Sequence, residues 1–195
     1  DASSSMVSEE KFERARQLAA AFSTMALLGT ERVSLFAATS TDERSATLQG
    51  CSGRSATRLV FEFLENVSPG GNSTIDAAVA SALRVHRGKG MAIVLSDFLT
   101  TGDVSRSFNL LNSAGLEIFA LQLLGPDEIE PDLTGDVRLV DCETGRTLDV
   151  SSARDLLDLY HEHRLAQQAW LSSQCRRRNG RFEMISSGST VESIL

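Results

Sequence analysis

The sequence has few of the residues on which disulfide-rich, zinc-stabilised and membrane-spanning proteins depend. Its three cysteines, Cys51, Cys142 and Cys175, lie far apart and form no CxxC pair. Neither a disulfide framework nor a structural zinc site is therefore expected, and a reducing, cytosolic setting fits best. No apolar run approaches the roughly 18 residues that a membrane helix requires, and the N-terminus lacks the charged-then-apolar pattern of a signal peptide.

Basic charge is also scarce in this chain. It contains 19 lysines and arginines against 26 aspartates and glutamates, which gives a formal net charge of −7. Because contacts with phosphate need a basic face, this composition speaks against a general nucleic-acid binder and favours basic partners over acidic ones. With 195 residues, 42% of them hydrophobic, the chain suits a single domain (1–195) with a buried core.

Apolar periodicity predicts an α/β domain in which strands alternate with helices. Ser8, Glu9 and Glu10 mark the start of a first helix that ends at Gly29. The run 91–95, MAIVL, is typical of a strand that is buried on both faces of a parallel sheet. Further strands are expected at 32–38, 45–49 and 116–124, and further helices at 55–66, after the turn SPGGNST, and at 103–112. The predicted fold is a three-layer α/β/α sandwich with a Rossmann-like, mostly parallel sheet.

The pattern changes after Leu124. The segment GPDEIEPDLTGD is an acidic loop that contains proline and glycine, and the strands at 137–142 and 147–150 are expected to form a hairpin. We interpret 125–151 as an insertion that contains this hairpin. A long helix over 153–178, a last strand over 182–185 and a short helical tail complete the prediction.

Three segments rich in oxygen atoms follow or face the carboxyl ends of the predicted strands, where ligands of parallel α/β sheets bind. Their candidate ligands are hydroxyls and carboxylates, without imidazole or thiolate: Asp1, Ser3, Ser5, Ser73, Thr74 and Asp97. Such hard oxygen ligands favour Mg²⁺, Mn²⁺ or Ca²⁺ over zinc or copper. The sequence therefore predicts a site for a hard divalent cation at this edge of the sheet.

This arrangement resembles the metal-ion-dependent adhesion site of von Willebrand factor A domains, whose signature is Asp-x-Ser-x-Ser, then a Thr, then an Asp. The resemblance implies that Ser3 and Ser5 bind the ion directly, while Asp1 and Asp97 act mostly through bound water. Neutral hydroxyls quench little of the ion's charge, so an open coordination position would attract an Asp or Glu from a protein partner.

The middle element of the signature departs from the family pattern. Von Willebrand factor A domains usually have Gly-Gly-Thr-x-Leu, whereas this chain has Gly-Asn-Ser-Thr-Ile at 71–75. The apolar register through Ile75, Ala78 and Val79 places Ser73 at the position of the family's threonine. Thr74 would take that role if the loop were shifted by one residue, and both hydroxyls remain candidates.

The order of several segments is similar to the bacterial family called domain of unknown function 58, a von Willebrand factor A relative. These segments are KFERARQLAAAF, RVSLFAA, VLSDF, LQLLGPDEIEPDLTG, LVDCETGRTLDV and the late helix with Tyr160. The resemblance implies cooperation with a MoxR-type AAA+ ATPase, commonly encoded beside members of this family. It also implies membrane segments upstream of this domain, which would tether the chain at the cytoplasmic side of the inner membrane.

The Asp-x-Ser-x-Ser loop of this fold normally follows a buried central strand, and no residue precedes Asp1 in this sequence. We therefore expect the central first strand to be missing. Its absence would expose the hydrogen-bonding groups of two neighbouring strands and place a cationic α-amino group beside the ion site.

Other interpretations of the same motifs predict different functions. Residues 1–5 alone could form a disordered tail or a helix entry, and 70–74 lacks the lysine of a phosphate-binding loop. His161 and His163 are two apart on a predicted helix, a spacing that does not suit metal ligation. No GxSxG turn or ordered catalytic triad is evident. We expect a protein-binding module rather than an enzyme; the alternative is a Mg²⁺-dependent phosphoester hydrolase.

Overall fold

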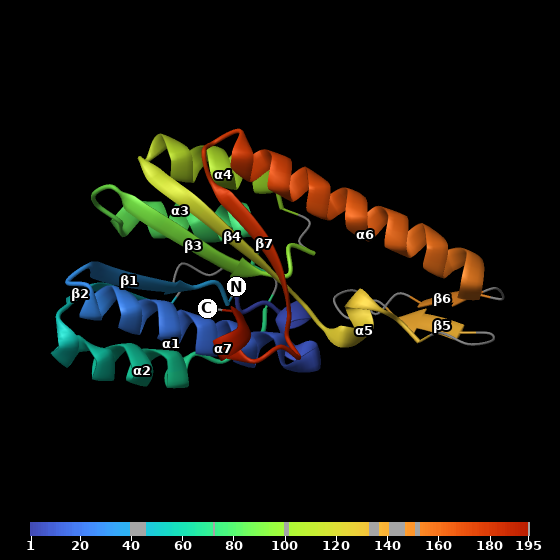
Figure 1. Cartoon of the computed structure of the whole chain (residues 1–195), viewed down its shortest axis with the longest axis horizontal. Helices are drawn as coiled ribbons and strands as arrows, with labels where there is room; N and C mark the ends of the chain where they lie inside the picture. The colour runs from blue at the N-terminus through green and yellow to red at the C-terminus, as the bar shows by residue number, and fades with distance from the viewer. Residues whose placement is uncertain are drawn as a thin grey trace.

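The computed structural model of the chain describes residues 1–39, 46–71, 73–99, 102–132, 137–140, 147–150 and 153–194. Within these residues the strands form three separate sheets: a parallel sheet in the order β3-β4-β7 and two antiparallel pairs, β1-β2 and β5-β6. Figure 1 shows the parallel sheet in the upper part of the molecule, with the β1-β2 pair below it. The fold is mixed α/β, as the alternation of apolar patterns predicts.

The parallel sheet consists of β3 (Gly90–Ser96), β4 (Leu116–Leu124) and β7 (Arg181–Ser186). β4 is buried on both faces. Ile118 and Ala120 pack in one core cluster with α3 (Ile75–Val85), α4 (Val104–Ser113) and α6 (Ala153–Arg176). Leu121 and Leu123 pack in a second cluster with α1 (Lys11–Leu28). The prediction of a buried strand at 116–124 is confirmed with the same bounds.

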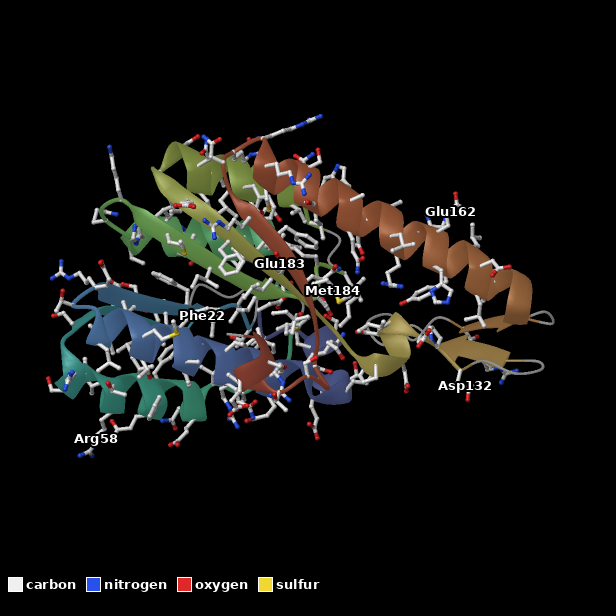
Figure 2. All side chains as sticks on the ribbon, in the orientation of Figure 1. Phe22, Arg58, Asp132, Glu162, Glu183 and Met184 are labelled. Carbon is white, nitrogen blue, oxygen red and sulfur yellow. The ribbon has the colours of Figure 1, made fainter. Side chains whose placement is uncertain are left out.

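Helix α1 covers the face of β4 that lies opposite α4 and α6. Phe22 of α1 points toward the sheet (Figure 2), where its ring meets the edge of Phe119 with the ring centroids 6.2 Å apart. A short 3₁₀ segment, η1 (Ser4–Glu10), precedes α1 and contains the expected start of the helix at Ser8. The regular helix thus begins three residues later than predicted.

The antiparallel pair β1 (Arg32–Ala37) and β2 (Ala46–Ser52) packs with α1 and α2 (Thr57–Asn66) around a third cluster. The cluster includes Leu27, Val60 and Leu64. A single 3₁₀ turn, η2 (Arg54–Ala56), connects β2 to α2. β2 extends three residues beyond the predicted strand at 45–49.

The prediction that the strand at 91–95 is buried on both faces is wrong. Met91 is 54% exposed and Ile93 is 36% exposed. The reason is the position of β3 at an edge: it pairs with β4, and no other described strand bonds to its opposite side. Of the three sheets formed by the described strands, only β3-β4-β7 is parallel, so the single, mostly parallel sheet stays a prediction.

The predicted hairpin forms an antiparallel pair, β5 (Val137–Val140) with β6 (Thr147–Val150). The residues between these strands, 141–146, are outside the described part of the chain. A short helix, α5 (Pro126–Ile129), connects β4 to this region, and a last helix, α7 (Val191–Ile194), follows β7. Figure 1 shows the hairpin beside the N-terminal half of α6, away from the parallel sheet. No helix in the described ranges has the length and apolar character needed to cross a membrane.

Two phenylalanines on different helices test where the core lies. Phe108 of α4 is fully buried, whereas Phe61 of α2 is 43% exposed. We expect Phe108→Ala to lower the free energy of unfolding by about 3–5 kcal/mol, because it removes a buried ring and leaves a cavity. Phe61→Ala is expected to cost about 1 kcal/mol or less. Urea denaturation measures both, and equal losses would contradict this assignment of the core.

Candidate metal centre

The first residues of the chain lie between the ends of β1 and β3. The backbone nitrogen of Asp1 donates to Leu95 O at 2.8 Å, and Ala2 N donates to Ala38 O at 3.0 Å. Gly70 N in turn donates to Ala2 O at 2.7 Å. These bonds bring residues 1–5 and the glycine loop before α3 to the carboxyl end of β3, as the sequence predicts.

The side chain of Asp1 connects its own segment to the end of β3. Its Oδ1 accepts a hydrogen bond from Ser3 N at 2.9 Å, and its Oδ2 accepts one from Ser96 Oγ at 2.6 Å. The hydroxyls of Ser3 and Ser5 are 3.1 Å apart, and both residues are buried. The Asp-x-Ser-x-Ser spacing thus brings one carboxylate and two hydroxyls into a single hydrogen-bonded network.

A tight turn after β3 orients Asp97. Phe98 N donates to Ser96 Oγ at 3.0 Å, and Leu99 N donates to Asp97 Oδ1 at 3.1 Å. Phe98 has a φ of 56°, which is unusual for a bulky residue. Such a backbone conformation costs about 1–3 kcal/mol and persists only where its surroundings enforce it.

Two glutamines bond to the carbonyl groups of this turn. Gln122 Nε2 donates to Asp97 O at 3.0 Å, and Gln167 Nε2 donates to Phe98 O at 3.1 Å. Gln122 is fully buried, and its Oε1 has no hydrogen-bond partner within the described residues. Residues from β4 and α6 therefore hold the backbone at Asp97 from the side opposite residues 1–5.

The buried side chain of Lys11, the first residue of α1, bonds to the carboxylate of Asp97. Lys11 Nζ is 3.0 Å from Asp97 Oδ2 and 2.6 Å from Glu128 Oε1. Burial acts to lower the pKa of Lys11, but the charge of Asp97 and the hydrogen bond with Glu128 outweigh it, so this pKa is raised above its ordinary value. Asp97 is thus neutralised by a residue of the chain.

Neither Lys11 nor Glu128 was predicted from the sequence as part of the site. A signal for Lys11 is its position four and seven residues before Ala15 and Leu18, on the buried face of α1. A lysine is also unfavourable at the positive end of a helix dipole, which suggests a specific partner. Glu128, three residues after the N-cap Gly125, accepts the N–H of Gly125, which is one half of a capping box, and the spacing GPDE contains that signal.

Thr74 and Ser73 lie at the start of α3, where Thr74 is the N-cap residue. A Cβ on Gly102 would be 2.9 Å from Thr74 Cβ and 2.7 Å from Asp76 Oδ1, so the loop after β3 packs closely against Thr74. Within the described ranges, no hydrogen bond joins the hydroxyl of Ser73 or Thr74 to the network around Asp1. The structure therefore brings both residues near the site without linking their side chains to it.

The donor chemistry of this network fits a hard divalent cation. Two carboxylates and the buried hydroxyls of Ser3 and Ser5 are oxygen ligands of the kind that Mg²⁺ and Mn²⁺ prefer. The described residues contain no group of three or more His, Cys, Asp or Glu side chains suited to a metal ion, so any site here depends on hydroxyls. Within the described residues, the ammonium of Lys11 opposes a second cation at Asp97. The α-amino group of Asp1 adds less positive charge than expected, because burial lowers its pKa to about 6.

Comparison with known proteins relates the chain to a family and to two solved structures. The family described as "Protein of unknown function DUF58" matches residues 1–169. An uncharacterized protein of Mycobacterium avium is 34% identical over 93 residues, which are 47% of this chain and 54% of the relative. The chain thus spans about half the length of the curated relative it matches.

The two solved structures are similar in fold. The conserved hypothetical protein BatB from Bacteroides thetaiotaomicron has a TM-score of 0.54 and 15% identity, covering 95% of this chain and 87% of that one. An aerotolerance-related membrane protein from Bacteroides fragilis has a TM-score of 0.50 and 18% identity, covering 89% and 80%. At such low identity, the likeness shows a shared fold alone.

The hydroxyl of Ser96 offers a test of the network. Ser96→Ala is expected to lower the free energy of unfolding by about 1–3 kcal/mol, because the buried Phe98 N–H loses its acceptor and Asp1 loses a donor. Ser193→Ala, which removes an exposed hydroxyl on α7, is the matched control and should stay within about 0.5 kcal/mol. Chemical denaturation measures both, and a Ser96→Ala protein as stable as the control would contradict the network.

Proposed function

This chain belongs to the DUF58 family of proteins of unknown function, and we propose that it is a metal-dependent protein-binding module and not an enzyme. Its partner would offer an Asp or Glu to a divalent cation at the carboxyl end of β3. The observation that carries this proposal is the network in which the Asp1 carboxylate accepts the N–H of Ser3 and the hydroxyl of Ser96, beside the paired hydroxyls of Ser3 and Ser5. The preferred cation is Mg²⁺, with Mn²⁺ and Ca²⁺ as alternatives.

Each residue of the network has a distinct role in this proposal. Ser3 and Ser5 would hold the ion through their hydroxyls, while Asp1 and Asp97 would act through bound water. The bound ion supplies a concentrated positive charge for a partner carboxylate, since neutral hydroxyls quench little of it. Asp1 also orients Ser3 through the Ser3 N–H, so the Asp-x-Ser spacing has a positioning role as well.

The loop before α3 would supply one further hydroxyl to the proposed site. Ser73 and Thr74 both remain candidates, and each has a hydroxyl. The close packing of Gly102 against Thr74 supports Thr74, because it places this residue beside the loop that follows Asp97.

The proposal includes a three-layer sandwich of the von Willebrand factor A type. Its support is that helices pack on both faces of β4. Asp1 and Ala2 bond to the ends of β3 and β1, two strands that do not pair with each other. A cavity of about 70 Å³ beside them is lined largely by apolar side chains of α1, β1 and α2.

The proposed partner comes from the family resemblance. A MoxR-type AAA+ ATPase, or a protein on which such an ATPase acts, would supply the carboxylate, and the module would serve in the assembly or maturation of a complex. The resemblance also underlies the proposal that this domain works near the cytoplasmic side of the inner membrane; one structure of similar fold is named an aerotolerance-related membrane protein.

Calorimetric titration with Mg²⁺ and Mn²⁺ tests the ion site. Ser3→Ala and Asp97→Ala are each expected to weaken binding by about tenfold or more. Ser193→Ala and Asp158→Ala change exposed residues of the same types and should bind like the unaltered chain. Metal-stimulated turnover of a generic phosphoester would instead support the hydrolase alternative, and loss of binding in all four variants would point to unfolding.

A pull-down with a purified MoxR-type ATPase tests the partner. We expect the complex to be retained in Mg²⁺ and lost in EDTA, because the ion bridges the hydroxyls of the module and the partner's carboxylate. Ser3→Ala should lose the complex even in Mg²⁺. A complex that persists in EDTA would contradict capture through a metal ion.

A further inference from the structure

Lys11 lies in the candidate metal centre although it is not one of the expected ligands. Its side chain is fully buried, and the ammonium contacts Asp97 at the end of β3 and Glu128 on α5. The other carboxylate oxygen of Asp97 accepts the N–H of Leu99. The chain itself therefore bonds to both oxygens of the carboxylate that the proposed function assigns to a divalent ion.

A divalent ion beside Asp97 would have to share this carboxylate with the ammonium. The two cations repel each other, and this repulsion is stronger in a buried site than in water. The local charges nevertheless leave room for an ion. Among the side chains, Asp1, Asp97 and Glu128 carry three negative charges against the single positive charge of Lys11, so a divalent cation balances the remaining two.

We propose that Lys11 is a built-in counter-cation that competes with the divalent ion for Asp97 and pairs with Glu128 alone when the ion is bound. This inference rests on the metal-binding function proposed above. Without the ion, the ammonium of Lys11 neutralises the Asp97 carboxylate and takes the place of the ion's charge. With the ion bound, the ammonium pairs with Glu128 of α5 alone. Binding of the ion therefore changes the contacts of a helix at the surface of the domain.

Glu128 is bonded in a way that can transmit this change. Its Oε2 accepts the N–H of Gly125 at 2.8 Å, and its backbone oxygen accepts the hydroxyl of Tyr160 on α6. α5 lies between the end of β4 and the region of the β5-β6 hairpin (Figure 1). A stronger ion pair between Lys11 and Glu128 is therefore expected to change the contact between α5 and α6.

Two substitutions that change the same ion pair in opposite directions test the proposal. Lys11→Met removes the competing charge, and we expect it to tighten Mg²⁺ binding, measured by calorimetry, by about tenfold or more. Glu128→Gln leaves Lys11 with Asp97 alone, and we expect it to weaken Mg²⁺ binding by a similar factor. Lys11→Arg keeps the charge and should retain the parent affinity. Arg58→Met is the control, because Arg58 points outward from α2 (Figure 2) and pairs only with Glu62 in the described structure.

A purely structural role of Lys11 gives a different result. Both Lys11→Met and Glu128→Gln would then weaken binding, because each damages the same buried pair, and this outcome would overturn the proposal. An unchanged Kd in Lys11→Met would overturn it too. If circular dichroism shows that Lys11→Met does not fold, the hydrogen exchange of amides in α5 decides, since a purely structural pair predicts no change there when Mg²⁺ saturates the parent chain.

Failure of this inference is distinguishable from failure of the proposed function. If the parent chain binds Mg²⁺ and Lys11→Met binds no more tightly, only the competition is lost. If the parent, Lys11→Met and Lys11→Arg all fail to bind, the metal-binding function itself is lost. Binding by Lys11→Met but not by the parent would support the competition directly.

Hydrogen exchange provides a readout for the coupling to α5. Saturating Mg²⁺ is expected to change the exchange of amides in α5 (Pro126–Ile129) in the parent chain. The change should be smaller in Glu128→Gln, where the side chain no longer forms an ion pair with Lys11. If the exchange rates of the α5 amides in the parent chain stay the same when Mg²⁺ saturates it, the site is not coupled to α5 and this part of the proposal is wrong.

Discussion

A buried ammonium is stable only where carboxylates replace its water, and Lys11 meets this requirement with Asp97 and Glu128. These three residues belong to α1, the end of β3 and α5. The ion pair therefore fixes the position of α1 relative to the parallel sheet, and α1 in turn places the segment with Ser3 and Ser5. Removing one partner of such a buried pair typically costs about 3–5 kcal/mol, because the other charge is left uncompensated. The arrangement of the candidate site depends on this contact more than on any single hydroxyl.

Strained backbone flanks both sides of the site. Glu9 and Glu10 adopt left-handed conformations with φ of 51° and 56°, directly before Lys11. Ser187 Oγ donates to Glu9 O, and Asp127 N donates to Glu9 Oε2 at 2.9 Å. The turn after β3 is held in a similar way by the bonds around Phe98. Since left-handed residues of this kind persist only where neighbours enforce them, the segments that carry the candidate ligands are positioned by the fold before any ligand binds.

The sequence predicts those parts of the molecule that depend on local patterns. The bounds of β4 follow from nine residues of nearly unbroken apolar character, and the Asp-x-Ser-x-Ser spacing predicts the hydroxyl pair of Ser3 and Ser5. Contacts between distant residues are not predictable in this way. The salt bridge of Lys11 with Glu128 joins residues 117 positions apart. The exposure of Met91 depends on which strands flank β3, and the apolar run MAIVL has the same pattern in a central strand and in an edge strand.

The hydrogen bonds of the carboxylates determine how the proposed site would meet a cation. Asp1, Asp97 and Glu128 each accept a hydrogen bond or an ion pair from the chain on both oxygens. Each of these oxygens has a donor from the protein, which fixes the orientation and charge of the carboxylate. Each oxygen also keeps a second lone pair. In the proposed function these groups can therefore set the charge around a bound cation, directly or through water, without giving up their bonds to the chain.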